Sequence, residues 1–494
     1  MVEVRPRTRA ASTSLQLGCL ALTLCSIACS QMQHLEDNVA QELEAMADRQ
    51  AALLVEHSNE GTTNRGTTLS FSEAVGRASR NDEEMLALIH ESRAQSLSIE
   101  QARSLRWPRL SVRVSAEGPV DASGDDAVVF GGVFIHYNLL DALLAGDAVT
   151  AESMRAQQLL LRRQSVTRRL ARQLLLLVAE LDAASTEAAL SQQALDIADR
   201  ALAKLEEEGA SEGLLRGEAR GWKDDRFRLA EAAWEAQWRW DLAAFRFAHM
   251  IGAGPGRAPE LADGKSYLPK PSGFREMKAV DREEFLRLWE TREDLQAEQI
   301  NLLLNEIEIL NAKRSRWPQP RLSLGIGNVQ LITANDTAAL VPRLSLSFPL
   351  VDMGDTRRRV EKARARRDQA AAILELQARS LIKELEEARW QVELTLERLD
   401  ATRRQRRTEG ERRRATEELW QRGRATSLTY YASQLTDLRA RLEDVRAEHR
   451  FRTAAIRFDS IRAHGPCESV IVNAVAAPST TSGKEAQNGH PGGP

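Results

Sequence analysis

The sequence predicts a mainly helical protein with a small β part, built as a tandem repeat. Three observations lead to this fold class. Of the 494 residues, 28% are charged and only 5% are aromatic, which is typical of long helices rather than of several globular cores. Sequence landmarks recur at a near-constant spacing of 210 or 211 residues. Short runs of alternating apolar and polar residues also interrupt the helical pattern in each copy.

The repeat is defined by three landmarks that occur in the same order in both halves. Arg106-Trp107-Pro108 recurs as Arg316-Trp317-Pro318, Tyr137 to Asp141 recurs as Phe348 to Asp352, and Ala243 to Phe247 recurs as Ala454 to Phe458. Three ordered matches at one spacing indicate two copies of a unit of about 200 residues.

The N-terminus predicts export from the cytoplasm. Arginines at positions 5, 7 and 9 precede an apolar stretch over residues 15–28, which is typical of a signal peptide over residues 1–28. Ser26-Ile27-Ala28-Cys29 is similar to a bacterial lipobox and makes Cys29 the expected lipid attachment site. An ordinary signal peptide cut nearby is the alternative, because Ser26 stands where leucine is usual. Few cysteines would remain after cleavage, so a disulfide framework is not expected.

Composition divides the rest of the chain. We expect an N-terminal extension over residues 29–67, a first repeat over 68–252, a linker over 253–278, a second repeat over 279–463 and a disordered tail over 464–494. The linker is dense in glycine and proline, and the tail is rich in serine, threonine, glycine and alanine.

Each repeat should begin with a helix and continue with two strands. Helices are expected over residues 72–105 and 282–315, the first after a capping box formed by Ser70 and Glu73. The Trp-Pro step ends each helix, because proline disfavours a helical residue before it. Residues 110–117 and 340–348 alternate between apolar and polar side chains, which predicts half-buried strands.

The pattern then becomes helical for about 60 residues in each copy. Residues 148–208 and 356–422 predict helices on the order of 100 Å long. Gly209 and Gly423 follow them, and glycine ends helices in the left-handed conformation without strain. A second helix returns after each glycine, so each repeat should contain a long helical hairpin.

Composition and motifs exclude several classes of function. The formal net charge is −3, which argues against a globally basic nucleic-acid-binding protein. The basic run over residues 403–414 lies in a helix among glutamates and is expected to be a solvated face. We find no motif for catalysis, a cofactor or a metal, so we do not expect an enzyme.

A membrane role stays open on the sequence. No apolar run of 18 residues follows the first 30, so no transmembrane helix is expected. Strands that cross a membrane are only half apolar and escape such a search. Four strands per chain are too few to close a barrel, so several chains would have to combine them.

From about residue 68 to residue 463 the chain resembles the outer-membrane efflux protein family, the TolC-like exit ducts. Residues 348–357, Phe-Pro-Leu-Val-Asp-Met-Gly-Asp-Thr-Arg, are similar to the family's strand-to-helix segment. Residues 422–434 are similar to its hairpin tip, a glycine followed by Ser/Thr, an apolar stretch and Ser-Gln. Copy one departs from the pattern, with Asn138 in place of the proline and extra residues before Gly146.

The resemblance implies a homotrimer in which four strands per chain form a twelve-stranded transmembrane β-barrel in outer-membrane lipid, continued by an α-helical tunnel across the periplasm. Such ducts act with a periplasmic adaptor protein and an inner-membrane pump of RND, MFS or ABC type, in tripartite efflux or type I secretion. The duct would be a passive, water-filled path. The alternative is a lipid-anchored periplasmic coiled-coil scaffold without a pore.

The resemblance also assigns roles to residues at the hairpin tips. The expected adaptor-docking residues are Gly209, Ser211, Gly423, Arg424 and Thr426. Trp420 occupies a position where an aromatic residue latches the closed tip in some family members, although plain packing would also explain a tryptophan there. The acidic tip positions of some members are Thr429 and Ala432 here, so an acidic constriction is not expected.

Charged residues in the strands are candidates for the lumen. Arg113, Glu117 and Arg343 fall on the polar side of their alternating runs, and inward-facing charge would tune the path. A register shifted by one residue would instead turn them outward at the rim.

Overall fold

The computed structural model describes residues 69–117, 128–207, 215–253, 264–275, 282–317, 319–330, 337–347 and 353–462. It divides into two compact units. The strand unit contains residues 97–153 and 307–363, and the helical unit contains residues 57–96, 154–306 and 364–494 as far as they are described.

The elements follow the predicted repeat. The first copy contains α2 (Phe71–Asn81), α3 (Glu83–Ser104), β1 (Arg109–Glu117), β2 (Val128–Asn138), α4 (Leu139–Glu207) and α5 (Leu215–Met250). Two 3-10 helices follow, η1 (Gly264–Tyr267) and η2 (Pro271–Phe274). The second copy contains α6 (Arg282–Thr291), α7 (Glu293–Arg314), β3 (Gln319–Gln330), β4 (Thr337–Ser347), α8 (Asp355–Gln421) and α9 (Ser427–Arg462). The long helices have 69 and 67 residues, which confirms the predicted hairpin helices.

The single helix predicted at the start of each repeat was wrong in both copies. Asp82 separates α2 from α3 in an extended conformation, and Arg292 separates α6 from α7. The Asp82 carboxylate accepts a 2.9 Å hydrogen bond from the Met85 backbone N–H, so it caps α3. Neither break coincides with a proline or a glycine in the sequence. The capping box of Ser70 and Glu73 at the start of α2 is confirmed.

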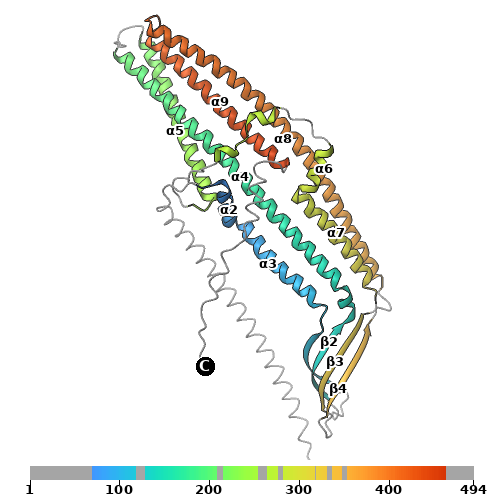
Figure 1. Cartoon of the computed structure of the whole chain (residues 1–494). Coiled ribbons are helices and arrows are strands. Elements are labelled where there is room, and N and C mark those ends of the chain that lie inside the picture. Colours follow the sequence, from blue (N-terminus) through green and yellow to red (C-terminus); the bar gives the residue numbers. More distant parts are fainter. Residues whose placement is uncertain are drawn as a thin grey trace, which may run out of the picture. The chain divides into compact units, whose positions relative to one another are not determined.

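The strand unit holds one antiparallel sheet in the order β1-β2-β3-β4. β2 of the first repeat pairs with β3 of the second, so the two repeats share the sheet, and Figure 1 shows β2, β3 and β4 side by side. β1 and β4 are its two edges. Each therefore has one side without a strand partner in the described part of the chain.

The two repeats pass from strand to helix differently. In the second, Met353 and Gly354 adopt left-handed φ values of 46° and 79° before α8 begins. In the first, α4 follows β2 directly, and the Asn138 side chain accepts a 3.2 Å hydrogen bond from the Leu140 backbone N–H. Asn138 thus caps the helix where the second repeat has a proline.

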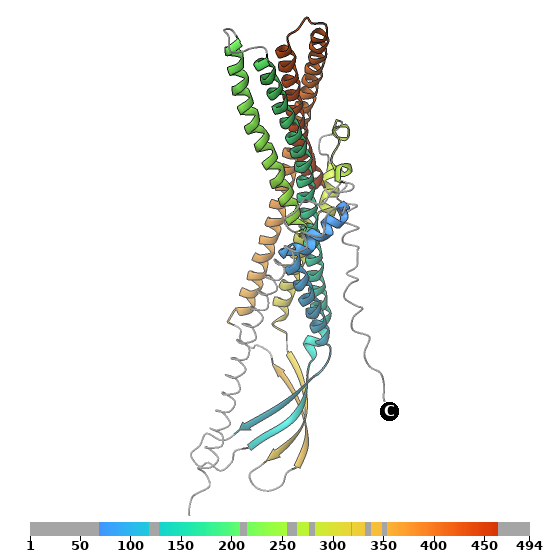
Figure 2. The same cartoon turned by 90° about the vertical axis from the view of Figure 1, so that its left-hand side faces the viewer.

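The helical unit places the two hairpins next to each other. Arg226 and Arg239 of α5 form ion pairs with acids of α4, and Arg452 of α9 pairs with Asp182 of α4. Arg406 of α8 pairs with Asp444 of α9. The four helices therefore follow the order α5-α4-α9-α8, and Figure 2 shows the green hairpin beside the red one.

Two apolar cores hold this unit together. One surrounds Phe71 and Leu174 and includes Phe247 near the end of α5. The other surrounds Leu295 and Leu385 and includes Phe451 of α9. The first core joins α2 to α4 and α5, and the second joins α6 and α7 to α8 and α9, so the repeats are built in similar ways.

Candidate functional site

The tip of the second hairpin is a defined turn. Gly423 has a φ of 68°, and its N–H donates to the Trp420 carbonyl at 2.9 Å, while the Arg424 N–H donates to the Leu419 carbonyl at 2.8 Å. These two bonds form a Schellman motif that ends α8. Thr426 then starts α9, because its hydroxyl accepts a 3.2 Å hydrogen bond from the Thr429 N–H.

The turn therefore needs a left-handed residue at Gly423 and a capping side chain at Thr426. No atom lies within 4 Å of the position that a Cβ would occupy on Gly423. The backbone conformation, rather than lack of space, therefore favours glycine there. Whether an adaptor contacts this turn stays a prediction.

Trp420 contacts its own hairpin. Its ring stacks on that of Tyr430, with centroids 4.6 Å apart and planes within 1°, and 40% of Trp420 is exposed. The stack joins the last turn of α8 to the first turn of α9, which favours packing over a latch between chains. A latch role in the assembled protein stays a prediction.

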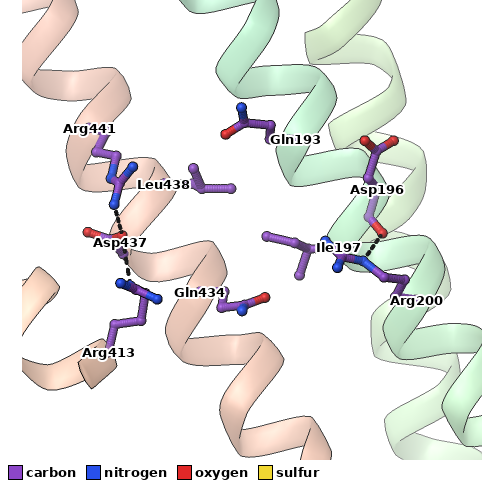
Figure 3. A pocket seen from close by; sticks show the side chains of 9 residues that line it. All are labelled: Gln193, Asp196, Ile197, Arg200, Arg413, Gln434, Asp437, Leu438 and Arg441. Carbon is purple, nitrogen blue, oxygen red and sulfur yellow. Dashed lines mark hydrogen bonds and ion pairs between the residues drawn. The ribbon is translucent and has the colours of Figure 1, made fainter. Parts of the chain in front are cut away.

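A groove of about 290 Å³ separates the two hairpins near their tips. Figure 3 shows it between α4, which contributes Ile197 and Arg200, and α9, which contributes Asp437 and Leu438. Ile197 and Leu438 belong to one apolar cluster. They lie at similar distances from the tip ends of their helices, so the two hairpin tips are level.

Asp437 is the central charge of this groove. Its side chain is only 4% exposed, and it pairs with Arg441 at 2.8 Å and with Arg413 at 3.3 Å. Burial of a carboxylate is costly without such partners. Arg413 of α8 therefore joins α8 to α9 at this level, while Arg441 neutralises Asp437 from within α9.

A second buried carboxylate repeats the arrangement one heptad away. Asp444 is also 4% exposed, and it pairs with Arg406 at 2.7 Å and with Arg403 at 3.9 Å. The prediction that the basic run over residues 403–414 is simply a solvated face was therefore wrong in part. Three arginines of the run reach buried aspartates of α9, which cannot be foreseen from α8 alone.

The outer helices carry exposed apolar stripes. On α5, Phe227, Trp234, Trp238 and Phe245 are 72%, 71%, 54% and 56% exposed. On α8, Leu376, Trp390 and Leu394 are 67%, 74% and 62% exposed. Spacings of four, seven and fourteen residues place each set on one face of its helix. Sequence reasoning missed both stripes, although the spacing of the α5 aromatics was visible.

The sheet has one charged and one uncharged face. Directly opposed residues of antiparallel strands share a face, and residues alternate along each strand. By the register, one face receives every charged residue of the four strands: Arg109, Arg113, Glu117, Arg321 and Arg343. This is the charged face. It includes Arg113, Glu117 and Arg343, as the alternation predicts, whereas their place in a lumen stays a prediction.

The other face is uncharged and apolar. Leu110, Ile135 and Leu324 are opposed in one row of that face, and they are 72%, 42% and 39% exposed. Among the described residues this row of aliphatic side chains across three strands is exposed, and it is expected to meet an apolar phase.

Three of the predicted site residues are not in the described part of the chain. Cys29, Gly209 and Ser211 lie outside the described residues. Within the described ranges, no group of histidine, cysteine and acidic side chains could hold a metal ion. None of the described helices has a stretch long and apolar enough to cross a bilayer.

Comparison with known proteins gives a family match in the second repeat. Residues 288–462 match the family model described as outer membrane efflux protein. No curated protein matches the chain.

Solved structures match over most of the chain. VceC, an outer membrane protein of Vibrio cholerae, is 16% identical with a TM-score of 0.62, covering 80% of this chain and 96% of its own. The open-state MtrE channel of Neisseria gonorrhoeae is 16% identical with a TM-score of 0.65, covering 80% and 89%. The CmeC channel of Campylobacter jejuni is 11% identical with a TM-score of 0.64, covering 82% and 89%. At these identities the structures establish a shared fold.

Proposed function

We propose that this chain, whose second repeat carries an outer membrane efflux protein domain, is one protomer of a homotrimeric exit duct that gives solutes a passive, water-filled path out of the cell. The match of residues 288–462 to the outer membrane efflux protein family and the channel fold support a location in the bacterial outer membrane, with the helices extending into the periplasm. The trimer, the barrel and the path are the proposal.

The observation that carries the proposal is the division of the sheet into two faces. In a barrel wall one face meets lipid and the other meets the lumen. The face with exposed Leu110, Ile135 and Leu324 suits lipid, and the charged face suits water. A lipid-anchored scaffold without a pore would have no use for such a sheet.

The open edges of the sheet support association. β1 and β4 each lack a neighbour on one side among the described strands, and unpaired backbone groups are costly in lipid. Pairing β4 of one chain with β1 of the next removes both edges. Three chains would supply twelve strands, a number within the range of known closed barrels.

The exposed helical stripes support the same contact. α5 and α8 are the outer helices in the order α5-α4-α9-α8, and each exposes an apolar stripe. A head-to-tail contact between α5 of one chain and α8 of the next would cover both stripes and can close a ring. Phe245 and Trp390 each lie about 30 residues from the tip end of their helix, so they should meet at one level.

Crosslinking tests this assembly. We expect a protein with Phe245→Cys and Trp390→Cys, in a Cys467→Ser background, to give dimers and trimers with a short bismaleimide. Each single-cysteine variant is the matched control and should give no trimer. A folded double variant that yields no crosslinked trimer would contradict the proposed contact.

The tips are the proposed adaptor-docking surface, and the energy would come from an inner-membrane pump of RND, MFS or ABC type. We propose that Gly209, Ser211, Gly423, Arg424 and Thr426 form this surface and that Cys29 carries the lipid. Gly423→Trp should reduce crosslinking to the cognate adaptor without loss of the trimer. Unchanged crosslinking would remove the tip assignment.

A further inference from the structure

The charged face of the sheet has its basic residues in one zone. Arg109, His136, Ser323 and Arg343 are directly opposed and form one row across all four strands. On every strand this row lies within four residues of the end that joins the helices. The row contains two arginines and a histidine and no acid.

Two more arginines lie on the same face, Arg321 closer to the helices than this row and Arg113 farther along the strands. Arg113 lies four residues after Arg109 on β1, and Arg321 is the third residue of β3. We call Arg109, Arg113, Arg321 and Arg343 the basic band. Glu117 is the single acid of the described strands and ends β1 eight residues beyond Arg109 and four beyond Arg113, or about 27 Å and about 14 Å away along an extended strand. No acid of the described strands therefore falls in the row of Arg109 and Arg343.

We propose that the basic band lines the lumen at the helix-proximal end of the barrel and makes this part of the path favour anionic over cationic solutes. This inference rests on the proposed duct, in which the charged face looks inward. Three chains would bring three sets of four arginines around one path. Fixed charge in a narrow path with low-dielectric walls raises the local concentration of ions of opposite sign.

The opposite orientation of the band is unfavourable. An arginine on the lipid-facing side of a barrel costs about 2–4 kcal/mol near the bilayer midplane and about 0–1 kcal/mol near the interface, so the cost of the opposite orientation is largest for Arg113, which lies farthest from the helices. The uncharged face carries no such penalty, because no charged residue of the described strands falls on it. The band therefore points to cargo that is anionic, such as organic acids or acidic amphiphiles, and disfavours metal cations.

The rate at which a cysteine in the row of Arg109 and Arg343 is modified measures the electrostatic potential there. Ser323→Cys, in the Cys467→Ser parent, places a thiol of nearly the same size between His136 and Arg343. We expect an anionic methanethiosulfonate to react faster than a cationic one of similar size, with a rate ratio at least about threefold higher than at Ser266→Cys. Ser266 lies on η1 of the helical unit and is exposed. The parent protein gives the background.

Removal of charge tests whether the band causes this preference. Adding Arg109→Gln and Arg343→Gln should bring the rate ratio at Ser323→Cys close to that at Ser266→Cys. Lys270→Gln, which removes one positive charge outside the strands, should leave the ratio unchanged. The preference should also weaken between 0.1 M and 1 M salt, since the Debye length falls from about 10 Å to about 3 Å.

The outcomes separate the inference from the duct itself. If Ser323→Cys reacts readily with both reagents and shows no anionic preference, the face is wet but the basic band has no effect, and the inference is wrong. If Ser323→Cys in the folded trimer reacts with neither reagent while Ser266→Cys reacts with both, the charged face does not line a lumen, and the proposed duct fails with it.

Discussion

The two helical hairpins share one fold but are held together by different charges. In the second, Asp437 and Asp444 are almost fully buried between α8 and α9, and each pairs with two arginines. In the first, Asp199 of α4 is 46% exposed and pairs with Arg226 of α5, which is 51% exposed. Glu180 and Arg246 pair in the same exposed manner, and Glu187, which is 12% exposed, pairs with Arg239, which is 49% exposed.

This difference suggests a division of labour between the hairpins. Buried carboxylates with paired arginines tolerate little change, since loss of one partner leaves a charge without compensation. Exposed ion pairs contribute little and are easily replaced by water. The second hairpin should therefore be the rigid one, and the first should be free to shift with small cost in energy.

The largest effect should come from Asp437→Ala. It leaves Arg413 and Arg441 without their buried partner, so we expect the free energy of unfolding to fall by about 3 kcal/mol, at the low end for buried pairs because the arginines are partly exposed. The matched variant in the first hairpin, Asp199→Ala, should cost less than about 1 kcal/mol. Denaturant unfolding of the purified protein in detergent gives both values, and equal losses would refute the difference between hairpins.

A second difference between the repeats lies at Asp459. Burial raises the pKa of its carboxyl to about 6, and nearby Arg462 only partly opposes this. The equivalent residue in the first repeat is Ala248, which is buried. Because the folded-state pKa exceeds the unfolded value of 3.8, this group favours folding below about pH 4, and that contribution is lost as the pH rises through about 6.

Asp459→Ala should therefore stabilise the protein by about 2 kcal/mol at pH 7 and have little effect at pH 4. The variant makes the second repeat resemble the first at this position. Thermal unfolding as a function of pH between 4 and 7 checks this expectation. The same pH dependence in the variant and the parent would show that Asp459 is not the group responsible.

The tip glycine should have a smaller effect. Gly423→Ala places a Cβ on a residue with a φ of 68°, and we expect a loss of about 1 kcal/mol in unfolding free energy. Gly410→Ala in α8 is the control, because its Cβ would meet Asp437 at an ordinary 3.7 Å, and it should stabilise the helix by about 0.5–1 kcal/mol. Gly209→Ala, measured in the same way, would show whether the first hairpin uses the same turn. If Gly423→Ala stabilised the protein, the left-handed cap would be contradicted.

The smallest effect is expected at Trp420. Trp420→Leu removes the stack on Tyr430 and should lower the unfolding free energy by about 0.5–1 kcal/mol, with no change in ionic current through the trimer. An increase in current would instead show that the tryptophan latches the tip, as some family members suggest.

The sequence predicted the architecture well because periodicity is a local property. The long helices, the strand alternation and the cap at Ser70 all follow from neighbouring residues. The helix breaks at Asp82 and Arg292 were missed. In the sequence, Asp82 resembles any exposed helical aspartate although it caps a new helix, and Arg292 resembles any exposed helical arginine. The pairs at Asp437 and Asp444 were also missed, because they depend on how α8 and α9 are placed next to each other.

The sequence predicted where the residues of the candidate site lie better than it predicted what they do. Gly423 and Thr426 were expected at a tip, and the structure gives them a turn and a cap. Arg113, Glu117 and Arg343 were expected on one polar face, which the strand register supports. The spacing of the aromatic residues on α5 is visible in the sequence, but the helix order is needed to show that α5 and α8 are outer helices and that their apolar stripes are exposed.

The most direct test of the duct is the ionic current through the purified wild-type trimer in a planar bilayer. The account predicts discrete current steps from a stable trimer, since the charged faces of three sheets would enclose one water-filled path. A stable trimer that inserts into the bilayer and passes no current would contradict it.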